Sequence, residues 1–234
     1  NKRRFEETTV MPNSSKSLGG SATYTGGVAS HAQVTATLNN YVAAEYVDDF
    51  DQLKTNFDFR QTYAESIGAA LARAYDSEII TVLDASSPST TVTASGGLTK
   101  AKFLEVAEGL NSNSVDTAER YMVMSPAALT DLLADSGVTT AADGVISNTA
   151  LTTGFIPNFL GFNIILSNLL NEASTGVRKC YAFQKNSVGL AIGKDVTAMI
   201  NYVPQKVSHL VAGEFSAGAA VIDATGVALI NVTE

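Results

Sequence analysis

Between residues 59 and 83 an apolar residue recurs at every fourth position, and this series constrains the fold more than any other feature. Its members are Phe59, Tyr63, Ile67, Leu71, Tyr75, Ile79 and Leu83. Because an α-helix has 3.6 residues per turn, the spacing predicts a helix of about 25 residues, roughly 37 Å long and about twice the usual length. Each four-residue step carries the row about 40° around the helix, so its members meet different partners in succession. Small residues beside the row favour close approach of other backbones; they are Gly68, Ala69, Ala70, Ala72 and Ala74.

Residues 1–46 lack helical periodicity and predict a projecting hairpin. Residues 5–10 and 33–38 have strand-like patterns, and the segment between them is polar and rich in glycine. An isolated two-stranded hairpin is marginally stable in water. We therefore expect it to need a partner surface, either from the rest of this chain or from a neighbouring subunit.

The remaining sequence predicts helices and strands that are segregated rather than alternating, which indicates an α+β fold. Residues 98–110 predict a second helix with Thr99 as its cap, and Ser125 and Pro126 predict the start of a third. Residues 136–154 predict a loop. The predicted strands cover residues 121–124, 162–166, 187–192, 197–203, 210–212, 219–222 and 227–232.

Charged residues make up only 16% of the chain, against roughly 25% in ordinary soluble domains. This deficit predicts that other subunits cover much of the surface. The formal net charge of −8 argues against a dedicated nucleic-acid binder, which usually has a basic face. No apolar run approaches the roughly 20 residues that a membrane-spanning helix needs, so we expect no membrane partner.

The side chains that carry most enzyme chemistry are scarce. The chain has two histidines, His31 and His209, and one cysteine, Cys180. No metal-site spacing occurs, and the segment from Gly189 to Lys194 departs from a phosphate-binding loop. We therefore expect no enzyme, no cofactor and no metal site. A small hydrolase that uses His209 with a serine is the alternative of a different class, because catalytic triads are recognised by geometry.

Several segments, in order along the chain, resemble major capsid (coat) proteins of tailed bacteriophages, which share the Hong Kong 97 fold. The resemblance is closest to coat proteins of short-tailed, podovirus-type phages. It is carried by residues 51–63 ahead of the long helix, by the strand–proline–helix segment 120–126, and by residues 161–166, 186–189 and 209–232.

The resemblance implies an α+β, Hong Kong 97-like capsid fold with an extended β-hairpin loop, a long spine helix, and peripheral and axial domains. Residues 1–46 would form the N-terminal arm and hairpin loop, residues 47–95 and 203–234 the peripheral domain, and residues 96–202 the axial domain. The charged residues of the spine helix would pair within the helix or across subunits. The candidate intersubunit contacts are Lys16, Tyr24, Arg60, Arg73, Asp76 and Glu78.

The resemblance also implies a major capsid protein that self-assembles into an icosahedral shell around a phage DNA genome. The expected partners are further copies of the chain in hexamers and pentamers, scaffold and portal proteins, and double-stranded DNA enclosed without sequence-specific binding. The expected location is the virion capsid, assembled in the host bacterial cytoplasm.

Some members of this family join subunits through a Lys–Asn isopeptide bond, with the asparagine just before a Leu-Val strand. Here that position reads Ser208-His209-Leu210-Val211, so Lys16 lacks the expected partner and we expect no covalent crosslink. An encapsulin-like nanocompartment shell is the alternative within the same fold, and a small β-rich adhesin is a further alternative.

Overall fold

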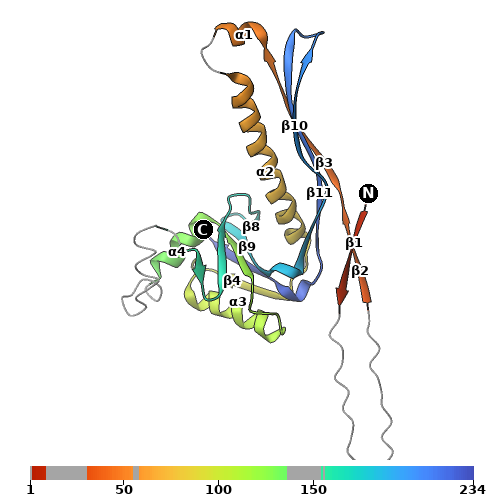
Figure 1. Cartoon of the computed structure of the whole chain (residues 1–234). Coiled ribbons are helices and arrows are strands. Elements are labelled where there is room, and N and C mark those ends of the chain that lie inside the picture. The colour runs from red at the N-terminus through yellow and green to blue at the C-terminus, as the bar shows by residue number, and fades with distance from the viewer. Residues whose placement is uncertain (1, 9–30, 55–57, 136–153, 155) are drawn as a thin grey trace, which may run out of the picture.

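The computed structural model describes residues 2–8, 31–54, 58–135, 154 and 156–234. Three sheets and the long helix α2 organise these residues (Figure 1). The strands are β1 (Lys2–Thr8), β2 (His31–Thr37), β3 (Asn39–Asp48), β4 (Thr90–Ala94), β5 (Arg120–Met124), β6 (Asn158–Phe159), β7 (Phe162–Leu166), β8 (Glu172–Ser174), β9 (Val177–Gln184), β10 (Val188–Val203), β11 (Ser208–Val221) and β12 (Val227–Thr233). The helices are α1 (Asp49–Lys54), α2 (Phe59–Ala85), α3 (Lys100–Ser112) and α4 (Pro126–Ala134), with short 3-10 turns at Lys185–Ser187 and Ala224–Gly226.

The long helix is confirmed, with α2 spanning 27 residues. Asp58 caps its start, accepting a hydrogen bond from the Arg60 backbone N–H at 3.1 Å. The apolar row packs in two parts, as its winding predicts. Ile67 and Leu71 lie in a core shared with the three-stranded sheet, whereas Leu83 lies in the core of the seven-stranded sheet. The helix therefore joins two separately packed units.

The first unit is the three-stranded antiparallel sheet in the order β10-β11-β3, which lies along the outer half of α2 (Figure 1). Phe215 of β11 stacks between Tyr75 of α2 and Tyr41 of β3, with ring centroids 4.1 and 4.8 Å away. The close approach of helix and sheet occurs at Gly213, where an added Cβ would lie 2.7 Å from both Ile67 and Leu71. Among the small residues of α2 expected to favour close approach, Ala74 packs against this core, whereas Gly68, Ala69 and Ala72 are exposed.

Two strand predictions needed correction. The four short strands expected between residues 187 and 222 are the two long strands β10 and β11, and the apolar alternation of β10 breaks where its register shifts between Ile192 and Thr197. Strand β3 and helix α1 were not predicted. The apolar run in β3, with Val42 and Ala44 beside Tyr41 and Ala43, has no alternation that would reveal a strand.

The second unit is the sheet with strand order β4-β12-β9-β5-β7-β6, in which β8 also pairs with β9. Thr99 and Ser125 cap α3 and α4 as predicted. Phe103 of α3 packs edge-on against Phe159 and Phe162, so α3 covers one face of the sheet. The end of α2 lies against the other face. Within this sheet, β12 lies between β9, with which it pairs antiparallel, and β4, with which it pairs parallel.

The predicted hairpin base is confirmed. Strands β1 and β2 pair antiparallel from Lys2↔Thr37 to Thr8↔His31, and the segment between them lies outside the described residues. Ala36 packs against Ala191 and Ala220. At Gly218 of β11 an added Cβ would lie 2.1 Å from the Thr37 carbonyl oxygen, so only glycine allows this crossing of the backbones. The arm is thereby attached to the first unit.

Asp84, in the last turn of α2, fixes the helix to the seven-stranded sheet. Its carboxylate accepts hydrogen bonds from Lys179 Nζ, from Tyr181 Oη at 2.9 Å and from Asn171 Nδ2 at 3.2 Å. The bond from Lys179, with those from Tyr181 and Asn171, holds the pKa of Asp84 below its ordinary value against the opposing effect of burial. An acidic residue near a helix C-terminus opposes the helix dipole. Asp84 therefore stabilises the fold only while this end of α2 is packed against the seven-stranded sheet.

We expect Asp84→Asn to lower the free energy of unfolding at pH 7 by about 1–3 kcal/mol, because the variant loses charge-assisted bonds while Lys179 stays partly buried. The folded-state pKa is depressed, so the contribution is present above the unfolded pKa near 4 and disappears as pH falls through the folded value. The difference between the two proteins should therefore shrink below about pH 4. Urea unfolding across pH measures this. Asp76→Asn, two turns earlier on an exposed carboxylate, is the matched control and should cost under about 0.5 kcal/mol.

Candidate intersubunit surface

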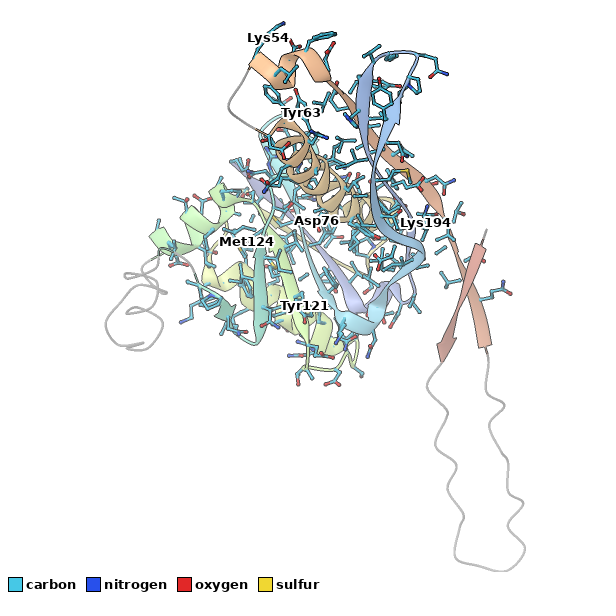
Figure 2. All side chains as sticks on the ribbon, turned by 45° about the horizontal axis from the view of Figure 1, so that its top comes forward. Lys54, Tyr63, Asp76, Tyr121, Met124 and Lys194 are labelled. Atoms are coloured by element: carbon cyan, nitrogen blue, oxygen red, sulfur yellow. The ribbon has the colours of Figure 1, made fainter. Side chains whose placement is uncertain are left out.

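The free end of the three-stranded sheet exposes an apolar surface, which we call the distal patch. Nine of the sixteen large hydrophobic side chains exposed in the described part of the chain belong to it. They come from β3, α1, β10 and the turn before β11, and Figure 2 marks this region with Lys54 on α1. Its members are Val42, Tyr46, Phe50, Leu53, Val196, Met199, Ile200, Tyr202 and Val207.

The strand register explains why part of the distal patch faces away from α2. Tyr41, Ala43 and Val47 contact the core beside α2, so the alternate residues Val42 and Tyr46 point to the opposite face. Val42 is 67% exposed and Tyr46 is 42% exposed. An antiparallel sheet with one solvated face normally carries polar residues there. The apolar side chains at these positions indicate a face that another molecule covers.

Ile200 and Tyr202 are exposed for a different reason. They pair in register with Val211 and His209 of β11 and so lie on the helix side of the sheet. Strand β10 is an edge strand, and both side chains lie far enough toward that edge to be half exposed. An edge strand offers unpaired backbone groups to a second chain, and natural edges are usually protected by charge. The two charges of β10 lie in the bulged segment, where Lys194 pairs with Glu214 of the neighbouring strand.

Charged residues border the distal patch, and several of them are engaged within the chain. Lys206 Nζ lies 3.8 Å from the ring centroid of Tyr46. Asp48 accepts a hydrogen bond from the Phe50 backbone N–H at 2.8 Å, and Lys54 pairs with Asp51 at 3.1 Å. The rim of the distal patch is therefore polar and its centre is apolar, an arrangement typical of protein interfaces.

The structure gives the sequence-predicted contact residues different environments. Arg60 Nε lies 4.0 Å from Asp58 Oδ1, next to the start of α2. Arg73 and Asp76 are exposed, and the described part of the chain contains no ion pair between them. Glu78 is buried, and its carboxylate forms hydrogen bonds to β3 rather than to other residues of α2. It accepts hydrogen bonds from Asn39 Nδ2 at 3.2 Å and from the Tyr41 hydroxyl, both on β3.

Lys16 and Tyr24 lie outside the described residues. Sequence reasoning also missed the distal patch, because its parts come from residues 42–53 and 196–207. The signal that was available was the apolar run of β3, whose aromatic and β-branched residues favour a strand. It carried no alternation to mark which side chains would be exposed.

His209, the histidine of the hydrolase alternative, lies on β11. Its ring contacts that of Tyr202 with centroids 5.3 Å apart. The neighbouring Ser208 lies on the same strand, so its side chain points to the opposite face of the sheet. Burial raises the pKa of the Cys180 thiol to about 11, which keeps it protonated and unreactive at neutral pH.

Within the described ranges, no group of three or more His, Cys, Asp or Glu side chains is placed to hold a metal ion. Among the same residues, no helix is both long and apolar enough to cross a membrane. The described structure also offers an exposed apolar surface, the distal patch, and the paired base of a hairpin.

The model of the phage capsid protein family matches residues 8–234, which is nearly the whole chain. This chain belongs to the phage capsid protein family. The family is one of structural proteins, so it gives no support to the hydrolase alternative.

Solved phage capsids share the fold of this capsid protein. The capsid structure of cyanophage P-SCSP1u is 17% identical in sequence with a TM-score of 0.78, covering 98% of this chain and 83% of that one. A structure from Mycobacterium phage Che8 is 19% identical with a TM-score of 0.74, covering 98% and 84%. The head structure of Helicobacter pylori bacteriophage KHP40 is 10% identical with a TM-score of 0.76, covering 99% and 85%. Comparison with curated proteins gave no match.

Proposed function

We propose that this capsid protein is the major subunit of an icosahedral shell that encloses the double-stranded DNA of a bacteriophage. The observation that carries the proposal is the distal patch, a large apolar surface on a chain that belongs to a capsid family over residues 8–234. Burying such a surface between copies favours association by roughly 25 cal/mol per Å² of apolar area. A shell repeats that contact many times and needs no single strong interface.

We further propose a Hong Kong 97-like architecture of the podovirus type, with the unit of α2, β3, β10 and β11 as the peripheral domain and the seven-stranded sheet with α3 and α4 as the axial domain. This division differs from the ranges 47–95 with 203–234 and 96–202 expected from the sequence. It follows the sheets instead, because strands of one sheet share backbone hydrogen bonds and move together. Residues 1–38 keep the proposed role of an arm that reaches a neighbouring subunit, whereas residues 39–46, which the sequence analysis placed in the arm, belong to β3 and so to the peripheral domain.

The proposed partners are copies of this chain in hexamers and pentamers, with scaffold and portal proteins during assembly in the host bacterial cytoplasm. The acidic net charge of −8 supports a wall that encloses DNA without binding it tightly. Nuclease-protected double-stranded DNA in purified particles would support this content. Particles that contain protein cargo and no protected DNA would instead identify an encapsulin-like nanocompartment.

We predict that the subunits of the assembled shell are not covalently joined, because Ser208 and His209 stand where the crosslinking asparagine is expected. Intact particles boiled in denaturing detergent should give a single band at the mass of one subunit. A ladder of dimers, trimers and larger species that survives boiling would contradict the prediction.

A further inference from the structure

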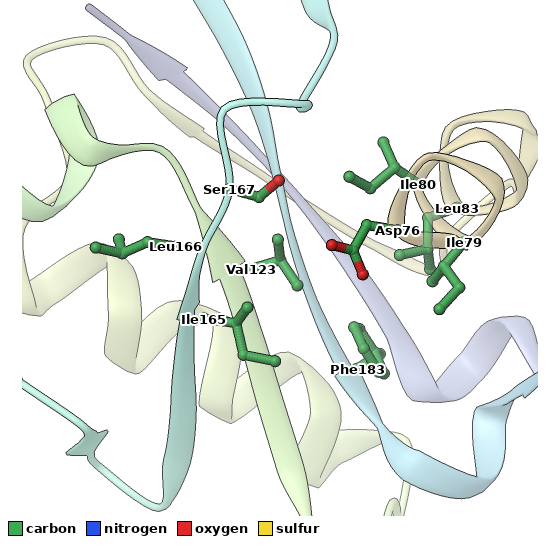
Figure 3. Close-up of a pocket in the computed structure, with 9 residues that line it drawn as sticks. All are labelled: Asp76, Ile79, Ile80, Leu83, Val123, Ile165, Leu166, Ser167 and Phe183. Atoms are coloured by element: carbon green, nitrogen blue, oxygen red, sulfur yellow. The ribbon is translucent and has the colours of Figure 1, made fainter. Parts of the chain in front are cut away.

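The pocket between α2 and the seven-stranded sheet has no part in the intersubunit surface described above. Its interior volume is about 150 Å³, and one side of it is open to solvent. Figure 3 shows α2 forming one wall, with β5 and β9 behind and β7 opposite. The lining residues are Asp76, Ile79, Ile80, Leu83, Val123, Ile165, Leu166, Ser167 and Phe183. An apolar cavity of about this size can hold a small organic molecule such as benzene.

The walls of the pocket are almost entirely apolar. Ile165 and Leu166 of β7 are 45% and 40% exposed there, whereas Val123, the partner of Ile165 on β5, is 8% exposed. Val123 and Ile165 are register partners on parallel strands, so both side chains point to the face where α2 lies. Water in such a pocket has few hydrogen-bonding partners, and an apolar molecule would displace it favourably.

One charged group interrupts these apolar walls. The carboxylate of Asp76 is directed from α2 toward the strands that carry Val123 and Phe183 (Figure 3). Within the described residues it forms no ion pair, and the only other polar side chain in the lining, Ser167, accepts a hydrogen bond from the Leu169 backbone N–H at 3.2 Å. Any occupant that displaced water from this carboxylate without supplying a positive charge would pay a desolvation cost.

We propose that this pocket binds a small organic cation, with an alkyl body against Ile79, Val123 and Ile165 and an ammonium group at the Asp76 carboxylate. The apolar walls supply the attraction for the body, and the unpaired carboxylate selects the charge of the head. The pocket is walled by four elements, which suits a small molecule better than a flat protein surface. The inference does not depend on shell assembly.

Equilibrium dialysis of the purified protein against three eight-carbon probes tests the proposal. We expect saturable binding of octylammonium, at least about tenfold tighter than that of 1-octanol, and no measurable binding of octanoate. Asp76→Asn should remove the preference for octylammonium over 1-octanol. Glu108→Gln, which removes one exposed charge from α3, is the control for net charge and should leave the preference unchanged.

A second variant tests the site without removing the carboxylate. Ile165→Lys, at an exposed position, places an ammonium group beside Asp76 and should weaken octylammonium binding at least about tenfold. The proposal is overturned if no probe binds saturably, if the preference for octylammonium survives Asp76→Asn, or if both variants bind like the wild type. A cryo-microscopy map with a neighbouring subunit's side chain in the pocket would also overturn it.

Discussion

Replacing both Leu53 and Ile200 with aspartate should leave the subunit folded and reduce the yield of closed particles by more than about tenfold. Both side chains belong to the distal patch and are 82% and 50% exposed, so the isolated subunit loses little apolar burial. In the shell, each aspartate would be buried without a partner, at a cost of several kcal/mol per subunit. Analytical ultracentrifugation measures the particle fraction, and circular dichroism reports whether the subunit is folded.

Leu104→Asp is the matched control for this experiment. Leu104 lies on α3, is 48% exposed and lies outside the distal patch. The Leu104→Asp variant shows how much a charge at an exposed hydrophobic position of the same chain changes the particle yield in general. A normal particle yield for the Leu53→Asp, Ile200→Asp variant would show that the distal patch is not an intersubunit contact.

Phe215→Ala should be the most destabilising single change within the subunit, lowering the free energy of unfolding by about 3–5 kcal/mol. The Phe215 side chain is 2% exposed and stacks on Tyr75 and Tyr41, so it joins α2 to β11 and β3. Phe215→Leu keeps much of the apolar area and loses the stacking, so we expect a smaller loss of about 1–2 kcal/mol.

Urea unfolding of the unassembled subunit measures these differences. Ile200→Ala, at a half-exposed position of the same sheet, is the control and should change the free energy of unfolding by under about 0.5 kcal/mol. A loss below about 1 kcal/mol for Phe215→Ala would mean that the aromatic stack does not hold α2 to the sheet.

The elements that the sequence predicted correctly have strong local signals. The four-residue apolar row specifies α2, and the hydroxyl side chains of Thr99 and Ser125 mark the starts of α3 and α4 because each accepts a hydrogen bond from a free backbone N–H. Strand β3 lacked such a signal. Both of its faces are apolar, since one packs on α2 and the other belongs to the distal patch, and that removes the alternation by which strands are recognised.

The candidate site was harder to predict than the fold. The exposed charges of α2 were sensible contact candidates, yet Glu78 lies inward and bonds to β3 because the helix rotates that position toward the sheet. The distal patch brings together residues 42–53 and 196–207, whose proximity depends on the pairing of β11 with both β3 and β10. Local sequence patterns carry no record of such long-range pairing.

Cryo-microscopy of particles assembled from the purified protein tests the central claim most directly. The account predicts closed icosahedral shells in which residues of the distal patch, Leu53 and Ile200 among them, are covered by neighbouring copies of the chain. Dispersed monomers at high concentration, or shells in which the distal patch stays open to solvent, would contradict it.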